Sequence, residues 1–276
     1  MKKYFGKFAS SGDVQTAVDS GALSKPYVAV VGDEVDYNSA EPDYSKMPLT
    51  FEILSAGTIG WKSETSAAVF AKTIEYSKND GPWISITSSK YDYPTINVVE
   101  GDIIQFRGNN TAYGVEGWSD RKSYFEVSVK CKAYGNIMSM ITTTGYETAT
   151  TLTASSTFEG FFQESSIVDA SNLVLPATTL TNNCYAYMFY HSILAKAPVL
   201  PAASVATWAY FSMFSECANL NYVKCLATDI SASVCVGNWM YNVSATGTFV
   251  KHPSMNDWPS GSNGIPNGWT VIDAVL

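Results

Sequence analysis

One pattern of apolar and polar positions is repeated between residues 158 and 249. Leu175-Pro176-Ala177 returns as Leu200-Pro201-Ala202, twenty-five residues later. Tyr185-Ala186-Tyr187-Met188-Phe189 returns as Tyr210-Phe211-Ser212-Met213-Phe214 at the same offset. A constant period of roughly 20 to 50 residues is typical of a solenoid, because each turn of the chain buries its apolar residues against the next turn. We therefore predict a solenoid over residues 158–249.

Weaker copies of the pattern flank the two strong ones. Phe161-Phe162 and Trp239-Met240 take the place of the Met-Phe pair, which brings the prediction to about four rungs. The outer rungs are expected to differ, since each has one face without a neighbour. Pro198 and Pro201 cannot donate hydrogen bonds, so we expect them at turns or strand ends. Residues 250–276 are predicted to form a C-terminal cap.

Residues 47–141 alternate apolar and polar side chains with a period of two, which is typical of strands with one buried face. Leu49 to Ile53 is one such run, and Phe125 to Ala133 is the longest. Asn79-Asp80-Gly81 and Glu100-Gly101-Asp102 each separate two runs, and each predicts a hairpin. Several short strands with turns between them predict a β-sandwich. The fold class is therefore mainly β.

The remaining segments are short. Residues 1–46 predict an anchoring segment with a short helix from Asp13 to Gly21 and a strand from Pro26 to Val31. This piece has too little apolar surface to fold well alone, so we expect it to dock on something else. Residues 142–157, rich in Thr and Ser, are predicted to be a linker. The residues expected to anchor the N-terminal segment are Tyr4, Phe5, Phe8, Tyr27, Val28 and Tyr37.

Composition narrows the classes of function. Of the 276 residues, 46% are hydrophobic and 15% charged, with 17 Tyr and 7 Trp, a balance that favours β-rich architecture. A net charge of −8, without any run of Lys or Arg, argues against a nucleic-acid partner. No stretch has the length of a membrane span, so membrane insertion is not expected. Met1-Lys2-Lys3 is not followed by an apolar region, so the start of the chain does not predict an export signal.

The chain offers little for catalysis or metal binding. Its five cysteines are odd in number and include no Cys-x-x-Cys, which favours buried free thiols over a pairing such as Cys217 with Cys225. His191 and His252 have no neighbouring Cys or carboxylate in a ligand pattern. We therefore predict no catalytic residue, no metal and no cofactor. A glycoside hydrolase is the enzymatic alternative, and it would need two carboxylates facing each other in a cleft.

One loop is a candidate for ligand binding. Residues 109–118 hold two aromatic residues beside amides, the combination that stacks against and hydrogen-bonds a sugar. An ordinary β-hairpin loop has the same composition, so both interpretations stay open. The candidate residues are Asn109, Asn110, Tyr113 and Trp118.

Particular residues of the repeat also carry a resemblance. Met213-Phe214 is followed by Cys217 and Leu220, and Met188-Phe189 is followed by the segment Ala197 to Ala202. This pattern resembles the BspA-like leucine-rich repeats of Bacteroidetes surface proteins and of phages that infect these bacteria. The chain departs from the pattern at Ser192, where the usual residue is cysteine.

A second resemblance concerns residues 4–37, which are similar to N-terminal segments that recur in Bacteroides phage proteins. Together the two resemblances imply a non-enzymatic virion structural protein, a head or tail fibre or a decoration protein. Residues 1–46 would bind other virion proteins, and the rest of the chain would adhere to a host-surface glycan or protein. Fibre proteins are usually symmetric, so a homo-oligomer is expected. The alternative is an exported Bacteroidetes cell-surface adhesin with the same repeats.

Overall fold

The computed structural model describes residues 3–8, 27–31, 34–37, 42–67, 70–117 and 121–276. The chain forms two units, Met1–Asp43 and Tyr44–Leu276. The fold is mainly β, and the helices in the described part of the chain are short 3-10 turns, including η1 (Tyr44–Lys46), η3 (Ile137–Met140) and η4 (Tyr146–Thr148). Within these ranges no helix has the length and apolar character that crossing a bilayer requires.

The first unit contains a three-stranded sheet in the order β1-β2-β3. Strand β2 (Tyr27–Val31) confirms the strand predicted at this position, and it pairs in parallel with β1 (Lys3–Phe8) and antiparallel with β3 (Glu34–Tyr37). The register brings Tyr4, Val28 and Tyr37 side by side across the three strands. Phe5 and Phe8 belong to β1, and Tyr27 begins β2. The helix predicted from Asp13 to Gly21 lies outside the described residues.

The second unit begins with two groups of strands. The smaller sheet has the order β10-β5-β8, and the larger begins β11-β4-β9-β6-β7, with antiparallel pairing throughout. The strands are β4 (Leu49–Ile53), β5 (Gly57–Ser63), β6 (Thr73–Lys78), β7 (Ile84–Thr87), β8 (Thr95–Val98), β9 (Ile103–Gly108), β10 (Ser123–Val127) and β11 (Cys131–Asn136).

Aromatic side chains from both sheets meet in one core. Phe51 and Phe106 come from the larger sheet, and Trp61 and Phe125 come from the smaller one. All four are fully buried. The ring centroids of Phe106 and Phe125 lie 4.6 Å apart, and those of Phe51 and Phe125 lie 5.4 Å apart. The two sheets therefore face each other across shared aromatic contacts.

One of the two predicted hairpins is confirmed. Strands β6 and β7 pair antiparallel. Asn79 and Asp80 between them both have positive φ (53° and 59°), the geometry that twists with the flanking strands. The hairpin predicted around residues 100–102 is wrong, because β8 pairs with β5 and β9 pairs with β4 and β6. This turn therefore connects β8 in the smaller sheet with β9 in the larger sheet, and the two strands contribute side chains to the core from opposite sides.

The longest alternating run, from Phe125 to Ala133, also crosses from one sheet to the other. Phe125, Val127, Val129, Cys131 and Ala133 are all buried, as the alternation predicts. The run nevertheless forms two strands, β10 in the smaller sheet and β11 in the larger one. Alternation records which side chains are buried, but it does not record which strand is the neighbour.

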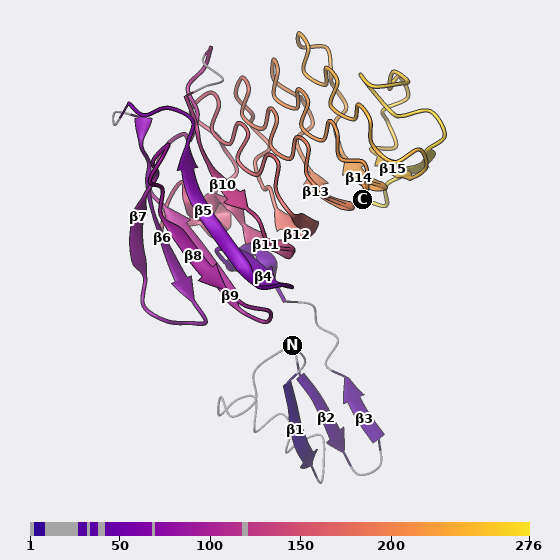
Figure 1. Ribbon diagram of the computed structural model, residues 1–276. Coiled ribbons are helices and arrows are strands. Elements are labelled where there is room, and N and C mark those ends of the chain that lie inside the picture. The colour runs from indigo at the N-terminus through magenta and orange to yellow at the C-terminus, as the bar shows by residue number, and fades with distance from the viewer. Residues whose placement is uncertain (1–2, 9–26, 32–33, 38–41, 68–69, 118–120) are drawn as a thin grey trace. The chain divides into compact units, whose positions relative to one another are not determined.

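The C-terminal half is a β-solenoid of about four turns, as predicted. Five parallel strands extend the larger sheet beyond β11: β12 (Ile167–Val174), β13 (Lys196–Leu200), β14 (Tyr222–Cys225), β15 (Thr248–Lys251) and β16 (Thr270–Asp273). In Figure 1 these strands follow one side of the solenoid, and looped turn segments follow the other. Pro198 lies inside β13 and not at its end, and the register of β13 with β14 shifts there because Pro has no N–H to donate.

The turn segments form their own ladder between rungs. Alternate N–H groups donate to the next rung, as Phe158 N does to Cys184 O (2.8 Å) and Tyr185 N to Ala209 O (3.1 Å). The intervening N–H groups close turns within a rung, as Met188 N does to Tyr185 O (3.2 Å). Within the turn segment of each rung, every fourth residue takes a left-handed backbone conformation. These residues are Ser156, Gly160 and Glu164, then Asn183, Tyr187 and His191, then Trp208, Ser212 and Glu216, then Val234, Asn238 and Asn242.

Aromatic rings fill the solenoid interior. Phe158, Tyr185 and Tyr210 stack from rung to rung with centroids 5.9 and 6.2 Å apart. All five cysteines are buried and free, which confirms the prediction of unpaired thiols. Trp269 is buried and Trp258 packs against the core, so the C-terminal segment closes the stack with its tryptophans.

The two halves of this unit share both sheet and core. Strand β11 pairs antiparallel with β4 on one side and parallel with β12 on the other. Phe125 and Phe161 lie 5.3 Å apart, which joins the aromatic core of the first half to the first rung. The segment 142–157 also contributes to the stack, since Leu152 N donates to Thr179 O and Ser156 N to Asn182 O.

Candidate functional site

Of the predicted ligand-binding loop, Tyr113 lies in the core. Its ring is fully buried against Phe161, and its hydroxyl donates to Met140 O at 2.7 Å. Asn110 is half-buried, and its Nδ2 donates to Thr73 O at 2.8 Å, which ties the loop to β6. Asn109 is exposed, and Trp118 lies outside the described residues. Tyr113 therefore offers no surface on which a ligand could stack.

A groove of about 480 Å³ opens where the same loop meets the turn segments of the solenoid. We call it the turn-face groove. Its lining comes from the end of the loop and from the first three rungs. The lining residues are Glu116, Gly117, Glu159, Asn182, Asn183, Ala186, Tyr187, Thr207, Trp208 and Phe211.

Three aromatic residues form one wall of the turn-face groove. The Phe211 ring lies 4.4 Å from that of Trp208 and 5.3 Å from that of Tyr187. Trp208 is 39% exposed, the most open of the three. Phe211 packs over the next rung at Gly237, where a Cβ atom would lie 2.9 Å from the ring. The wall is thus held by contacts between rungs, and Trp208 leaves ring surface free.

Two residues of this aromatic wall have a left-handed backbone. Tyr187 and Trp208 have φ values of 57° and 58°, a left-handed conformation that is uncommon for bulky residues. The inward residues of the same segments, such as Tyr185 and Met188, fill the core. The same left-handed conformation recurs in all four turn segments, also at the buried Ser156 and Ser212, so it belongs to the solenoid architecture as a whole.

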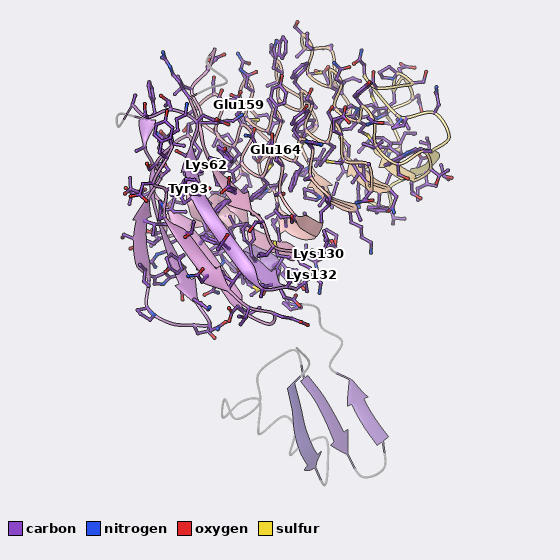
Figure 2. All side chains as sticks on the ribbon, viewed as in Figure 1. Lys62, Tyr93, Lys130, Lys132, Glu159 and Glu164 are labelled. Carbon is purple, nitrogen blue, oxygen red and sulfur yellow. The ribbon has the colours of Figure 1, made fainter. Side chains whose placement is uncertain are left out.

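The polar side chains of the same lining, here called the polar wall, include two carboxylates. Asn182 Nδ2 donates to Glu116 Oε1 at 3.2 Å, which links the loop to the second rung. Glu159 is buried, and burial raises its pKa above the usual range. Burial also lowers the pKa of the neighbouring Lys122, whose Nζ would lie 2.8 Å from a Cβ added at Gly160. Figure 2 shows Glu159 and Glu164 among the turn segments.

The chemistry of the lining follows from these groups. Two carboxylates and two amides supply hydrogen-bond acceptors, and the amides and Thr207 also donate. Among the described lining residues there is no Lys or Arg. A groove lined by aromatic rings and by polar groups suits a ligand that has both apolar C–H faces and hydroxyl groups.

A second cluster of charged groups lies elsewhere on the surface. Lys62 Nζ on β5 lies 2.8 Å from Glu126 Oε1 on β10, and the Tyr93 hydroxyl donates to the same carboxylate. Hydrogen bonding to Glu126 raises the pKa of Lys62, since it favours the charged form. Lys62 and Tyr93 are labelled side by side in Figure 2. These contacts join neighbouring strands and line none of the described grooves.

Metal-binding chemistry has no support in the described ranges, which contain no grouping of three or more His, Cys, Asp or Glu side chains that could hold an ion. A glycoside hydrolase would need a pair of carboxylates in a cleft. Glu116 and Glu159 both line the turn-face groove.

Sequence reasoning did not find the aromatic wall. Tyr187, Trp208 and Phe211 lie within the repeat, whose period predicts only that apolar residues are buried between neighbouring turns. A partial signal was present in the sequence, because each strong rung carries one further aromatic residue, Tyr187 or Phe211, between its first Tyr and its Met-Phe pair. Comparison with protein-family models, with curated proteins and with solved structures finds no match to this chain.

Proposed function

We propose that this chain is a non-enzymatic structural protein of a phage virion, a head or tail fibre or a decoration protein, that adheres to the host surface. The observation that carries the adhesive role is the turn-face groove. It has a partly exposed aromatic wall that is held in place by contacts between rungs. A rigid scaffold lowers the entropic cost of binding, because little has to be ordered when the ligand arrives.

The virion assignment rests on resemblance. The repeats resemble BspA-like leucine-rich repeats, and residues 4–37 resemble segments of Bacteroides phage proteins. In this proposal residues 1–46 bind other virion proteins, and Tyr4, Val28 and Tyr37 are aligned across the three strands of this segment. The two facing sheets of residues 47–141 act as a β-sandwich body that carries the solenoid. Assembly as a symmetric homo-oligomer would present several grooves at once.

Adhesion is tested by binding of the labelled full-length chain to a panel of Bacteroidetes cells, measured by flow cytometry. Trp208→Ala should lower cell binding at least tenfold, because Trp208 is the most exposed ring of the wall. Tyr91→Ala is the matched control, since Tyr91 is 78% exposed and lies outside the groove lining. Equal binding by the Trp208 variant, or no binding to any cell, would refute the adhesive role.

The virion assignment has a separate test. Cryo-microscopy of particles with and without this chain should show surface density that disappears in its absence. Unchanged density would contradict the assignment. Recovery of the native chain from an outer-membrane or secreted fraction, in the absence of phage, would instead support the exported adhesin.

The non-enzymatic assignment is tested on any oligosaccharide that the groove binds. The expected result is intact ligand after prolonged incubation, analysed by mass spectrometry. Cleavage that is abolished by Glu159→Gln would show that Glu116 and Glu159 form a hydrolytic pair, and it would overturn this part of the proposal.

A further inference from the structure

The turn-face groove also carries information about the charge of its ligand. This inference rests on the proposed adhesive function and specifies what the groove recognises. We propose that the groove takes a neutral oligosaccharide and rejects glycans that carry carboxylates, such as sialylated or uronic-acid chains.

The aromatic wall supplies the first reason. Tyr187, Trp208 and Phe211 make contiguous ring contacts across two neighbouring rungs. The axial C–H groups of a pyranose form an apolar face that packs on such rings, and this contact requires no charge on the ligand. A volume of about 480 Å³ falls within the usual range for small-ligand sites, which suits a short saccharide.

The polar wall supplies the second reason. Sugar hydroxyls are donors as well as acceptors, and a carboxylate accepts such donors more strongly than a neutral group does. Glu116 is placed toward the groove by the hydrogen bond from Asn182. Asn183 and Thr207 offer further donors and acceptors on neighbouring rungs. This set matches hydroxyl groups and neutral amides such as N-acetyl substituents.

The charge balance supplies the third reason. A carboxylate on the ligand would face Glu116 and Glu159, and no Lys or Arg is among the described lining residues to compensate it. Lys122, whose charge acts on Glu159, is itself 7% exposed and does not line the groove. The net charge of −8 adds a long-range repulsion of the same sign. Recognition of carboxylates normally relies on Arg or Lys, which this lining lacks.

The test compares matched pairs of oligosaccharides for binding to the full-length chain by isothermal titration calorimetry. The probes are neutral trimers of glucose, mannose, galactose and N-acetylglucosamine, with lactose paired against sialyllactose and galactose trimer against galacturonate trimer. At least one neutral probe should bind. Each acidic probe should bind at least tenfold more weakly than its neutral partner. Trp208→Ala should abolish binding of the neutral probe, and Tyr91→Ala should leave it unchanged.

Glu116→Lys provides a second variant that does not depend on the tryptophan. Removing one negative charge and adding a positive one should narrow or reverse the preference against sialyllactose. The midpoint of thermal unfolding of each variant is measured as a control for folding. The inference would be overturned if the unmodified chain bound acidic probes as tightly as neutral ones or more tightly. It would also be overturned if the Trp208→Ala variant still bound the neutral probe.

The outcome separates this inference from the proposed function. Cells that still bind the chain after removal of their glycans, but not after protease treatment, would show a protein receptor. In that case the adhesive function stands and the glycan inference fails. Binding of neutral probes at the groove by a chain that binds no cell would support the glycan site and refute host adhesion.

Discussion

The buried side chain of Asp102 stabilises the turn that connects the two sheets. It lies in the turn that leads from β8 to β9, and its carboxylate accepts hydrogen bonds from Val99 N and Asn79 Nδ2, both at 2.8 Å. The Lys78 ammonium lies 2.7 Å from the same carboxylate. Burial by itself would raise the pKa of Asp102, but these partners favour the charged form and lower it to about 2.

This pKa predicts acid sensitivity. A carboxyl whose pKa falls from 3.8 in the unfolded chain to about 2 in the folded chain stabilises the fold above pH 4. The contribution, of about 2 kcal/mol, is lost as the pH falls from 4 to 2. Asp102→Asn should therefore unfold more easily than the parent at pH 6, and this difference should shrink toward pH 2. Urea unfolding across this range measures it, and parallel pH profiles for the two chains would contradict the prediction.

At the scale of secondary structure, β11 is the strand that joins the two halves of the larger unit. It can do so because Gly135 takes a φ of +85° where the backbone passes close to the preceding segment. A Cβ atom at this position would lie 2.0 Å from the carbonyl oxygen of Pro48. The bridge between Pro48 and Asn136 depends on this close approach. A side chain at Gly135 would push the two backbones apart.

A matched pair of glycine substitutions tests this requirement. Gly135→Ala should lower the free energy of unfolding by about 3 kcal/mol, since it combines backbone strain with a steric clash. Gly145→Ala should lower it by only about 1 kcal/mol, because Gly145 also has positive φ (72°) but a Cβ there meets nothing within 4 Å. Denaturant unfolding compares them, and equal losses would show that the contact at Pro48 is unimportant.

At the scale of the molecule, residues 44–276 form one unit because sheet and core are continuous. The larger sheet has ten strands, in the order β7-β6-β9-β4-β11-β12-β13-β14-β15-β16. Phe51 on β4 lies 5.9 Å from Phe162 in the first rung, and Phe162 lies 5.3 Å from Phe189 in the second. An aromatic path therefore leads from the antiparallel strands into the solenoid.

This continuity predicts cooperative unfolding of residues 44–276. Phe51→Leu and Phe189→Leu remove buried aromatic contacts from the two halves, and each should lower the same thermal transition, because neither half exposes its core alone. Differential scanning calorimetry with tryptophan fluorescence measures the transitions. Two separate transitions, each sensitive to one of the variants, would show that the halves unfold independently.

Local patterns predicted much of this fold. The Asn79-Asp80-Gly81 turn, the buried residues of the alternating runs and the period of the solenoid all depend on neighbours in sequence or on a unit that repeats. The pairing of β8 and β9 did not follow from such patterns, because Glu100-Gly101-Asp102 suits a hairpin and a crossing between sheets equally well. Tyr113 was misplaced for a similar reason, since its partner, the carbonyl of Met140, lies far along the chain.

The repeat contains both kinds of feature, those that the sequence pattern predicts and those that depend on long-range contacts. Each rung stacks on a near copy of itself, so the residues that face inward had to recur at a fixed spacing, and the spacing was visible without coordinates. The turn-face groove had no such signature. It forms because Glu116, from the first half of the unit, lies beside Asn182 of the second rung, in a groove that Trp208 of the third rung also lines. Long-range packing alone creates that neighbourhood, and only the folded structure displays it.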